Sequence, residues 1–217
     1  MKTIYLLRHG QTEWNVEGRM QGRLDSALTS HGQQQAIGHG EKLKALGGVE
    51  HMFVSPSGRT QETAYLLNSF LGAAITFDEV LMERDCGLWG GMTINEIKER
   101  FPSEWESRSK APYEYRPPGG ENTPDMIERV RDFVDRLHGG SAQSVAIVTH
   151  AVMSRAILTH LLGLKPTVAG RLRHPNEAFY QLEVGAESIR CSYFLDGKGP
   201  TDGLLHDPVN ANVEPLR

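Results

Sequence analysis

The sequence YLLRHGQTEWN, residues 5–15, places an apolar run directly before an arginine, a histidine and a glycine. Residues 4–7 are apolar at every position, which predicts a short strand buried on both faces, as in the middle of a parallel sheet. Arg8 and His9 then stand side by side at the end of this strand. Two adjacent cationic or near-cationic side chains in such a place need an explanation, and two further strand ends supply it.

The strands predicted at residues 52–54 and 145–148 also end in polar side chains. SPSGR, ending at Arg59, follows the first strand, and Thr149 and His150 follow the second. Open α/β sheets bind ligands outside the carboxyl ends of their strands, so we expect Arg8, His9, Arg59 and His150 to meet in one crevice. Arginine binds phosphate oxygens bidentately, and helices that start after Ser57 and His150 would add backbone N–H groups. The crevice therefore suits a phosphoryl group.

Strand and helix patterns alternate over most of the chain, which predicts a single α/β domain over residues 1–217. The sheet is expected to be largely parallel and covered on both faces, with an irregular, lid-like insert at residues 85–122. We expect helices over residues 31–46, 59–71, 93–110 with a break at Pro102, 123–137 and 151–162, a strand at 75–77, a hairpin of 178–184 with 189–195, and mostly loop from 196 onward.

The composition of the 217 residues limits the function classes. A net charge of −4 gives no support for nucleic-acid binding or a membrane-surface role, and no stretch approaches the roughly 20 apolar residues of a membrane span. The two cysteines, Cys86 and Cys191, are too few for a disulfide scaffold, so we expect a reduced, cytoplasmic protein. The oligomeric state is open, and a homodimer is one of the options.

The motifs of other phosphate chemistries are missing from the sequence. There is no GxxxxGK[ST] loop, neither cysteine begins a Cx5R arrangement, and the nine histidines show no HExxH or other compact metal spacing. GxSxG and GxGxxG are also missing. A histidine nucleophile remains.

LRHGQTEWN, residues 7–15, resembles the signature of the histidine phosphatase superfamily, which includes the cofactor-dependent phosphoglycerate mutases. The match continues in consistent order over about residues 3–160, through RMQG at 19–22, DSALT at 25–29, residues 55–64, residues 83–91, PGGE at 118–121 and VTH at 148–150. RHG alone would be weak, but the motif set is highly specific. The resemblance implies a three-layer α/β/α sandwich, mostly parallel with one antiparallel strand, and a reaction that needs no metal or other cofactor.

The resemblance also implies a role for each matching residue. His9 would be the nucleophile, phosphorylated during turnover, and Glu83 would be the proton donor. The residues expected to bind substrate or phosphate are Arg8, Asn15, Gln21, Gly22, Arg59 and His150. Neutralising the dianionic phosphoryl group requires positive charge, so we expect a neutral His9, a charged His150 and a Glu83 that begins protonated or shares a proton with the phosphate.

The sequence departs from the family pattern at two positions. Ala151 replaces the glycine that commonly follows the second histidine, and Gly90 stands where a glutamate is common. That glutamate is not the usual proton donor, so Glu83 keeps its predicted role. Glu121 is either a pocket residue or a favourable charge at a helix N-terminus, and we prefer the second interpretation. Trp14 and Trp89 are expected to be structural, with a place in the pocket lining as the alternative for Trp89.

Three functions fit these residues. The first is a phosphatase for small phosphomonoesters, because residues 111–113 and 118–121 resemble the broad-specificity phosphatase branch. The second is a phosphoglycerate mutase, although the chain is shorter than typical mutases. The basic residues of the insert also do not match the mutase pattern; they are Lys98, Arg100, Arg108, Lys110 and Arg116. The third is a catalytically idle protein that binds a phosphorylated ligand. The expected catalytic residues are all present, which argues against the third.

Overall fold

The computed structural model describes residues 1–206, apart from the side chain of His138. Residues 207–217, the end of the predicted domain, lie outside the described residues, and the single-domain assignment stays a prediction. The strands are β1 (Lys2–Arg8), β2 (His51–Val54), β3 (Ala74–Phe77), β4 (Ser144–Thr149), β5 (Ala178–Val184), β6 (Ile189–Leu195) and β7 (Lys198–Asp202). The helices are α1 (Glu13–Val16), α2 (Ser30–Ala45), α3 (Gly58–Leu71), α4 (Ile94–Arg100), α5 (Pro102–Lys110), α6 (Thr123–Gly139), α7 (Ala151–Leu162) and α8 (Pro166–Ala169), with 3₁₀ turns at Glu79–Leu81 and Gly87–Trp89.

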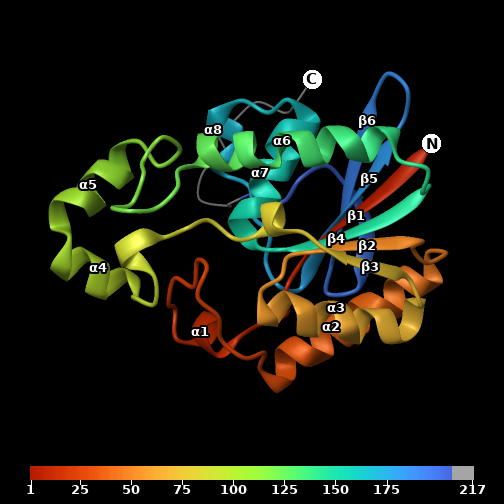
Figure 1. Ribbon diagram of the computed structural model, residues 1–217, viewed down its shortest axis with the longest axis horizontal. Coiled ribbons are helices and arrows are strands. Elements are labelled where there is room, and N and C mark those ends of the chain that lie inside the picture. The colour runs from red at the N-terminus through yellow and green to blue at the C-terminus, as the bar shows by residue number, and fades with distance from the viewer. Residues whose placement is uncertain (207–217) are drawn as a thin grey trace.

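The strands form one sheet in the order β3-β2-β4-β1-β5-β6-β7 (Figure 1). β1 to β4 are parallel, which confirms the α/β fold with a mostly parallel sheet. β5 and β7 run against them, so the sheet has a second antiparallel strand where the resemblance implied one. The prediction that the chain is mostly loop from residue 196 onward missed β7, because all five of its residues are exposed and carry no apolar pattern.

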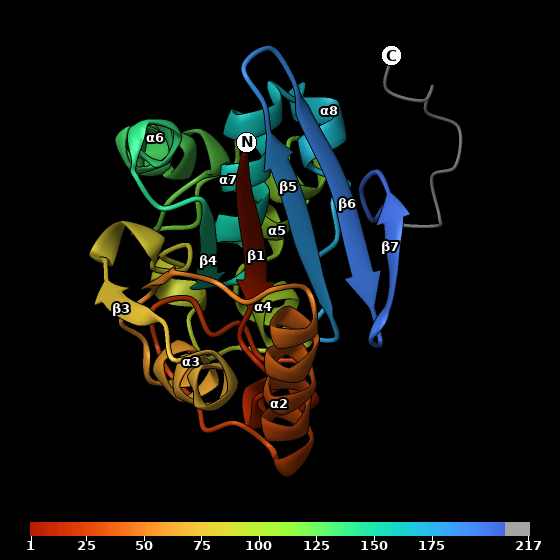
Figure 2. The ribbon, with the colours of Figure 1, turned by 90° about the vertical axis from the view of Figure 1, so that its right-hand side faces the viewer.

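The sheet is the middle layer of three (Figure 2). Helices α6 and α7 cover one face of the sheet and pack into a first hydrophobic cluster. Helices α2 and α3 cover the other face and pack into a second cluster. Along β1, Ile4 and Leu6 pack into the first cluster, whereas Tyr5 and Leu7 pack into the second. Side chains alternate between the faces of a strand, so a strand buried on both sides must be apolar at every position, as residues 4–7 are.

The predicted insert contains helices α4 and α5, which lie to one side of the sheet in Figure 1. It has a small hydrophobic cluster of its own around Trp89, which is fully buried and stacks on Tyr115 with 5.3 Å between ring centroids. This packing agrees with the structural role expected for Trp89. Helix α6 begins at Thr123, as expected, and its N-cap is Asn122, whose side chain accepts a hydrogen bond from the backbone N–H of Asp125. Among the described helices, none is both long and apolar enough to cross a membrane.

Candidate active site

The register of the parallel strands brings three distant segments to one edge of the sheet. Arg8 pairs with Thr149, and Val54 pairs with Val148, so the residues that follow each strand lie at the same level. The imidazole rings of His9 and His150 lie 5.4 Å apart between centroids. Arg59, from the first turn of α3, places Nη2 3.0 Å from His150 Nδ1. His9, Arg59 and His150 therefore share one site, as their positions at strand ends led us to expect.

His9 is held as a neutral imidazole with a fixed tautomer. Its Nδ1 lies 2.8 Å from the carbonyl oxygen of Gly10, and because a carbonyl only accepts, Nδ1 carries the proton and Nε2 keeps its lone pair. Burial, with the nearby guanidinium groups of Arg8 and Arg59, holds the pKa of His9 well below its usual range. A neutral histidine with a free Nε2 is the form that can act as a nucleophile.

The backbone around His9 is fixed by side chains from two other segments. Asn176 Nδ2 donates to the carbonyl oxygen of His9 at 2.7 Å, and Gly10 N donates to Thr63 Oγ1 at 3.0 Å. Asn176 precedes β5, which runs antiparallel to β1, so the beginning of β5 lies at the edge where β1 ends. Asn176 is not among the site residues predicted from the sequence. The orientation of the hairpin strand was the signal that would have placed it there.

His150 is neutral in this structure, whereas the sequence analysis expected it to be charged. The guanidinium of Arg59 has only donors, so His150 Nδ1 must accept, and its Nε2–H donates to Ser55 Oγ at 2.8 Å. Burial and the charge of Arg59 also hold the pKa of His150 well below its usual range. The expectation left out Ser55 and the close approach of Arg59, which together fix the neutral tautomer.

The two arginines of the site, Arg8 and Arg59, differ in how many guanidinium N–H groups are left without a protein acceptor. Arg59 is 1% exposed; its Nη1 donates to Leu24 O and Asp25 Oδ1, and its Nη2 donates to Gly22 O and His150. Only Nε–H of Arg59 is left, so this geometry does not allow it the expected bidentate grip on phosphate. Arg8 uses Nη1 for the carbonyl oxygen of His174 at 3.0 Å. Within the described chain, Nε of both arginines is buried without a hydrogen-bond partner.

The guanidinium of Arg8 stays charged although it is buried. Burial lowers the pKa of Arg8 to about 10, against the attraction of the Glu83 carboxylate, so the guanidinium is charged at neutral pH. Two buried guanidinium N–H groups without acceptors, those of Arg8 and Arg59, would be satisfied by the oxygens of an anion.

Glu83 lies at the N-terminus of α7. Its carboxylate accepts hydrogen bonds from the backbone N–H groups of Val152 and Met153 at 3.1 and 3.2 Å, and from that of Arg84 at 2.7 Å. We expected the first turns of α3 and α7 to face the bound anion. Protein carboxylates take these N–H groups instead: Glu83 at α7, and Asp25 Oδ1 at the backbone N–H of Arg59 in α3. Helix N-termini attract carboxylates for the same reason that they attract phosphate.

A cavity of about 300 Å³ opens beside Glu83. Gln21 and Gly22 line it, as the resemblance implied, and so do Arg84, Arg108 and Arg155. Asn15 is not among the lining residues; its side chain accepts from the backbone N–H of Thr12 in the capping box of α1. Gln21 reaches the same turn, with Nε2 donating to Thr12 Oγ1 at 2.7 Å. Asn15 is thus placed to hold the chain after His9, and its contact with phosphate stays a prediction.

Glu121 is not among the residues that line this cavity, and it directly precedes Asn122, the N-cap of α6. Its carboxylate pairs with Arg129 of α6, at 3.0 and 3.1 Å, and accepts from the backbone N–H of Asp85 at 2.8 Å. Arg129 also donates to the carbonyl oxygens of Val80 and Met82, just before Glu83. The Glu121–Arg129 pair therefore ties the segments on both sides of Glu83 to α6.

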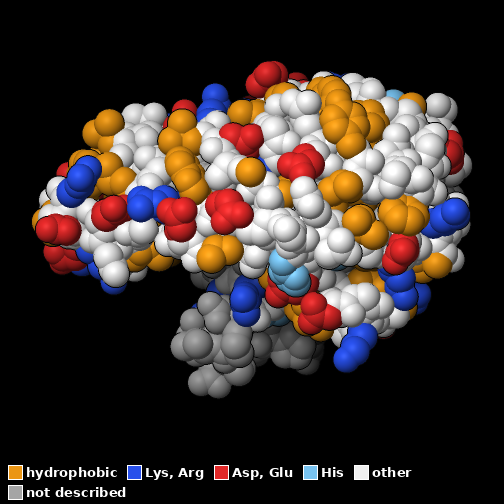
Figure 3. All heavy atoms as spheres, turned by 90° about the horizontal axis from the view of Figure 1, so that it is seen from below, with side chains coloured by type: hydrophobic (Ala, Val, Ile, Leu, Met, Phe, Trp, Pro, Cys, Tyr) orange, Lys and Arg blue, Asp and Glu red, His pale blue; other side chains and the backbone are white. Residues whose placement is uncertain are grey.

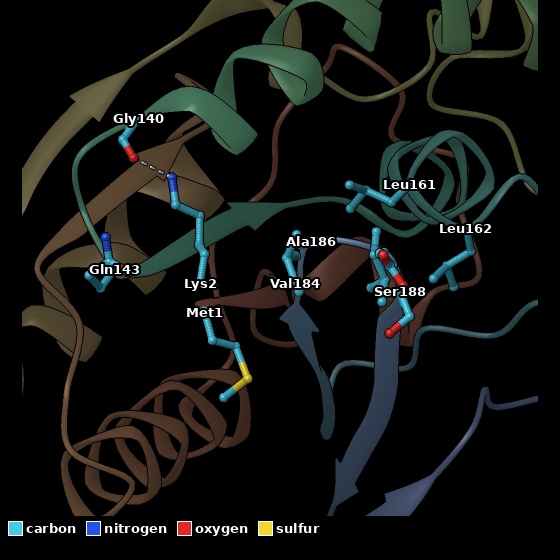
Figure 4. Close-up of a pocket in the computed structure, with 12 residues that line it drawn as sticks. Met1, Lys2, Gly140, Gln143, Leu161, Leu162, Val184, Ala186 and Ser188 are labelled. Carbon is cyan, nitrogen blue, oxygen red and sulfur yellow. Dashed lines mark hydrogen bonds between the residues drawn. The ribbon is translucent and has the colours of Figure 1, made fainter.

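A larger cavity, of about 890 Å³, lies at the opposite edge of the sheet (Figure 4). Lys2, at the beginning of β1, is one of its charged residues, but Lys2 Nζ donates to the carbonyl oxygens of Leu137 and Gly140 at the end of α6. This lysine is therefore satisfied by the protein itself, and the cavity is distant from the strand ends that carry the histidines. Among residues 1–206, no three His, Cys, Asp or Glu side chains are grouped as a metal site.

The model of the histidine phosphatase superfamily (branch 1) matches residues 4–196. The chain belongs to the histidine phosphatase superfamily. A superfamily relative from Salmonella paratyphi B, named probable phosphoglycerate mutase GpmB, is 34% identical over 177 residues, which are 81% of this chain and 82% of the relative. YhfR of Bacillus stearothermophilus is similar in structure, with a TM-score of 0.79 and 31% identity over 92% of this chain and 98% of that one.

A third relative within the superfamily is the mycobacterial glucosyl-3-phosphoglycerate phosphatase, solved in complex with VO3. It has a TM-score of 0.78 and 28% identity, covering 92% of this chain and all of that chain. The superfamily therefore includes relatives named as phosphatases and relatives named as mutases, and the fold places the present chain with both.

Proposed function

We propose that this protein is a phosphatase that hydrolyses small phosphomonoesters through a phosphohistidine formed on His9. The observation that carries the proposal is the state of His9: neutral, with its proton fixed on Nδ1 by the Gly10 carbonyl and its Nε2 lone pair free. The charged guanidinium groups of Arg8 and Arg59 beside it would neutralise the phosphoryl oxygens, and preorganised charge is usually the largest catalytic term in phosphoryl transfer.

In the first step, Nε2 of His9 attacks phosphorus and the bond from phosphorus to the leaving oxygen breaks. The leaving alkoxide takes a proton from Glu83, which yields the free alcohol and the phosphohistidine. Because Glu83 accepts three backbone N–H groups as a carboxylate, we propose that this proton is the one the substrate brings on its phosphate. In the second step, water attacks phosphorus, gives a proton to Glu83, and the P–N bond breaks to release inorganic phosphate.

The proposal is tested by measuring phosphate release from a panel of phosphorylated metabolites and from p-nitrophenyl phosphate. We expect wild-type activity in the presence of a chelator, because no step above uses a metal, and a loss of several orders of magnitude in His9→Ala. Wild-type protein denatured at alkaline pH during turnover, where the P–N bond is stable, should carry phosphate bound to histidine, and His9→Ala should carry none. Equal activity of the two proteins would falsify the proposed nucleophile.

A phosphoglycerate mutase is the second candidate, because the Salmonella relatives carry that name. The same phosphohistidine would then transfer its phosphoryl group to the free hydroxyl of a bound phosphoglycerate instead of to water. The bisphosphate so formed would return its other phosphoryl group to His9 and leave as the isomeric phosphoglycerate. Interconversion of 3- and 2-phosphoglycerate that is stimulated by the bisphosphate and outpaces phosphate release would favour this function over hydrolysis. We also propose a cytoplasmic location, which the free thiols of Cys86 and Cys191 support.

A further inference from the structure

Glu83 lies in a segment of the chain without regular secondary structure. Residues 82–86 connect the 3₁₀ turns Glu79–Leu81 and Gly87–Trp89, and none of them belongs to a helix or a strand. The first turn of α7 holds the carboxylate of Glu83, but it does not hold the backbone that carries this side chain. A group on an irregular segment is placed accurately only where its surroundings fix that segment too. The position of the proposed proton donor therefore depends on what holds the backbone on both sides of it.

An ion pair between α6 and the end of the insert holds this backbone. Arg129 donates from Nη1 to the carbonyl oxygens of Val80 and Met82, at 2.7 and 3.1 Å, on the N-terminal side of the proton donor. Its Nε and Nη2 donate to the two carboxylate oxygens of Glu121 at 3.0 and 3.1 Å, a bidentate geometry that fixes both side chains in one arrangement. On the C-terminal side of the proton donor, the backbone N–H of Asp85 donates to Glu121 Oε2 at 2.8 Å.

The last residues of the insert are also fixed against the segment that follows the proton donor. The backbone N–H of Glu121 donates to the carbonyl oxygen of Asp85 at 2.9 Å. A Cβ on Gly120 would lie 2.5 Å from the same carbonyl oxygen, so the two backbones are in direct contact. Asp85 is thus bound to Glu121 through both its N–H and its carbonyl, and this part of the backbone moves only together with the ion pair.

The ion pair is largely buried, and it lies outside the cavity beside Glu83. The side chains of Glu121 and Arg129 are 16% and 18% exposed, and neither residue lines that cavity. Acidic and basic side chains are interspersed over the face of the molecule in Figure 3, and exposed pairs of such side chains contribute little. A largely buried pair is different, because the loss of one partner leaves the other charge unpaired. An exposed arginine, Arg23, comes no closer to the Glu121 carboxylate than 3.5 Å.

We propose that Glu121 and Arg129 are positioning residues that set the place of the Glu83 carboxylate for proton transfer. The inference rests on the proposed function, in which Glu83 passes a proton to the leaving oxygen and takes one from water. Proton transfer requires heavy atoms within about 2.6–3.2 Å of each other, so a shift of the backbone on either side of Glu83 weakens it. The nucleophile should be affected little, because within residues 1–206 neither residue is hydrogen-bonded to His9.

The test uses two substrates whose leaving groups differ in their need for a proton. An alkyl phosphate from the metabolite panel releases a poor alkoxide leaving group, whereas p-nitrophenyl phosphate releases a phenolate that leaves without a proton. In Glu121→Gln we expect kcat/KM for the alkyl phosphate to fall about 10-fold to 100-fold, the effect of a displacement of about 1 Å. The value for p-nitrophenyl phosphate should change little. Arg129→Lys, which keeps the charge but loses the fork of N–H groups, should show the same selective loss.

The comparison uses kcat/KM because this parameter reports the steps up to release of the alcohol and leaves out the water step, which the two substrates share. Glu128→Gln and Arg131→Lys are the matched controls, since they make the same changes in an exposed ion pair on α6 and should leave the ratio of the two values unchanged. In a Glu83→Gln background, adding Glu121→Gln should cause no further loss with the alkyl phosphate if the ion pair acts through Glu83. Glu121→Asp, which keeps the charge and shortens the side chain, replaces Glu121→Gln if that variant does not fold.

A second readout needs no turnover. The backbone N–H groups of Arg84, Val152 and Met153 donate to the Glu83 carboxylate, so their hydrogen exchange, followed by NMR, reports whether the carboxylate stays in place. We expect these three N–H groups to exchange up to about tenfold faster in Glu121→Gln, as for the loss of a hydrogen bond. Their exchange in Glu128→Gln should match that of the wild type.

An equal loss for both substrates would overturn the proposal, because the ion pair would then support the site as a whole and not the proton donor. An additive loss in the Glu83→Gln background would overturn it as well. If the wild type hydrolyses no phosphomonoester but the three N–H groups exchange faster in Glu121→Gln, the positioning of Glu83 stands and the proposed function fails. If phosphomonoesters are hydrolysed and neither the ratio nor the exchange changes, the proposed function stands and the positioning role is wrong.

Discussion

The floor of the site and the wall of the adjoining cavity hold their charged side chains in opposite ways. The floor consists of Arg8, His9, Arg59 and His150, and each side chain has at least one hydrogen bond inside the protein. The wall consists of Arg84, Arg108 and Arg155, whose guanidinium groups have no acidic partner among the described residues. The floor is organised before any substrate arrives, whereas the described residues leave the charges of the wall unpaired.

The arrangement of the floor suits catalysis, and the arrangement of the wall suits selection between substrates. A nucleophile and the groups around it must be held in one geometry, because small displacements are costly in rate. Groups that choose between substrates need only be satisfied better by one substrate than by another, so they can stay unpaired until it binds. Substitutions in the floor are therefore expected to lower all activity, and substitutions in the wall are expected to change which substrates react.

After that of the nucleophile His9, the largest effect is predicted at Glu83, which stands between the two regions. Glu83→Gln removes the proposed proton donor but keeps a side chain of the same size at the N-terminus of α7. For an alkyl phosphate, whose alkoxide is a poor leaving group, we expect kcat to fall about 10²-fold to 10⁴-fold. For p-nitrophenyl phosphate, whose leaving group needs no proton, the loss should be much smaller. Steady-state kinetics with the two substrates measure the difference.

An equal loss for both substrates would show that Glu83 does not deliver the proton and acts only as part of the structure. A control at Gln21, which lines the same cavity, is not suitable, because Gln21→Glu would remove the hydrogen bond that the Gln21 amide donates to Thr12. Glu79→Gln is suitable, since it changes an exposed glutamate four residues earlier and should leave both rates unchanged.

Two glycines allow the backbone at the floor to be compared with the backbone of the insert. A Cβ on Gly10, directly after His9, would lie 2.2 Å from the carbonyl oxygen of Gly32 in α2, so Gly10→Ala must displace one backbone segment. We expect a loss of about 3 kcal/mol in the free energy of unfolding. Gly119, in the loop of the insert, has φ +74° and open space around its Cβ position, so Gly119→Ala costs only the strained backbone, about 1–2 kcal/mol.

Urea unfolding of the two variants checks the comparison. A loss in Gly119→Ala as large as that in Gly10→Ala would mean that the insert is packed as rigidly as the floor. Activity should follow the same order, because displacing Gly10 also moves His9, whose Nδ1 donates to the Gly10 carbonyl.

The floor could be predicted from the sequence because strand register determines it. Buried runs that end in Arg8 and His9, in Ser55 and in Thr149 and His150 must deliver those residues to one edge of a parallel sheet. The rule gives the neighbourhood of each side chain but not its partners. It could not show that Ser55 and Arg59 hold His150 neutral, or that Asp25 takes the N-terminal N–H that was expected to face phosphate.

The wall could not be predicted, because no periodic pattern places it. Residues 151–162 read as a buried helix, in which Arg155 is one of four polar residues, and only the packing of α7 shows that this position lines the cavity. Arg108 depends on how the insert folds around Trp89, which involves residues far apart in the sequence. Strand β7 was missed for a related reason. All of its residues are exposed, so its pairing with β6 produces no alternation of apolar and polar residues in the sequence.

The smallest predicted effect concerns acid. Four buried histidines have a lowered pKa, mainly through burial: His9, His39, His150 and His174, the last to about 3. His9 and His150 belong to the floor. His39 and His174 lie directly behind it, since His39 Nε2 donates to the carbonyl oxygen of Asn176 and the His174 carbonyl accepts from Arg8. The wall contains no histidine, so acid should act first on the floor.

A histidine whose pKa is lower in the folded protein binds a proton more readily when the chain is unfolded. Its contribution to stability is therefore complete above the unfolded pKa of about 6.5 and is lost as the pH falls from there toward the folded value, at up to about 1.4 kcal/mol per pH unit for each histidine.

His39→Gln keeps an N–H donor for Asn176 but cannot be protonated, so it should reduce the slope of unfolding free energy between pH 6.5 and 5 by up to that amount. Urea titrations at several pH values measure the slope, and His31→Gln, at an exposed position on the same helix, controls for the loss of a histidine. If His39→Gln kept the full wild-type slope, His39 would not be one of the groups whose proton uptake destabilises the protein between pH 6.5 and 5.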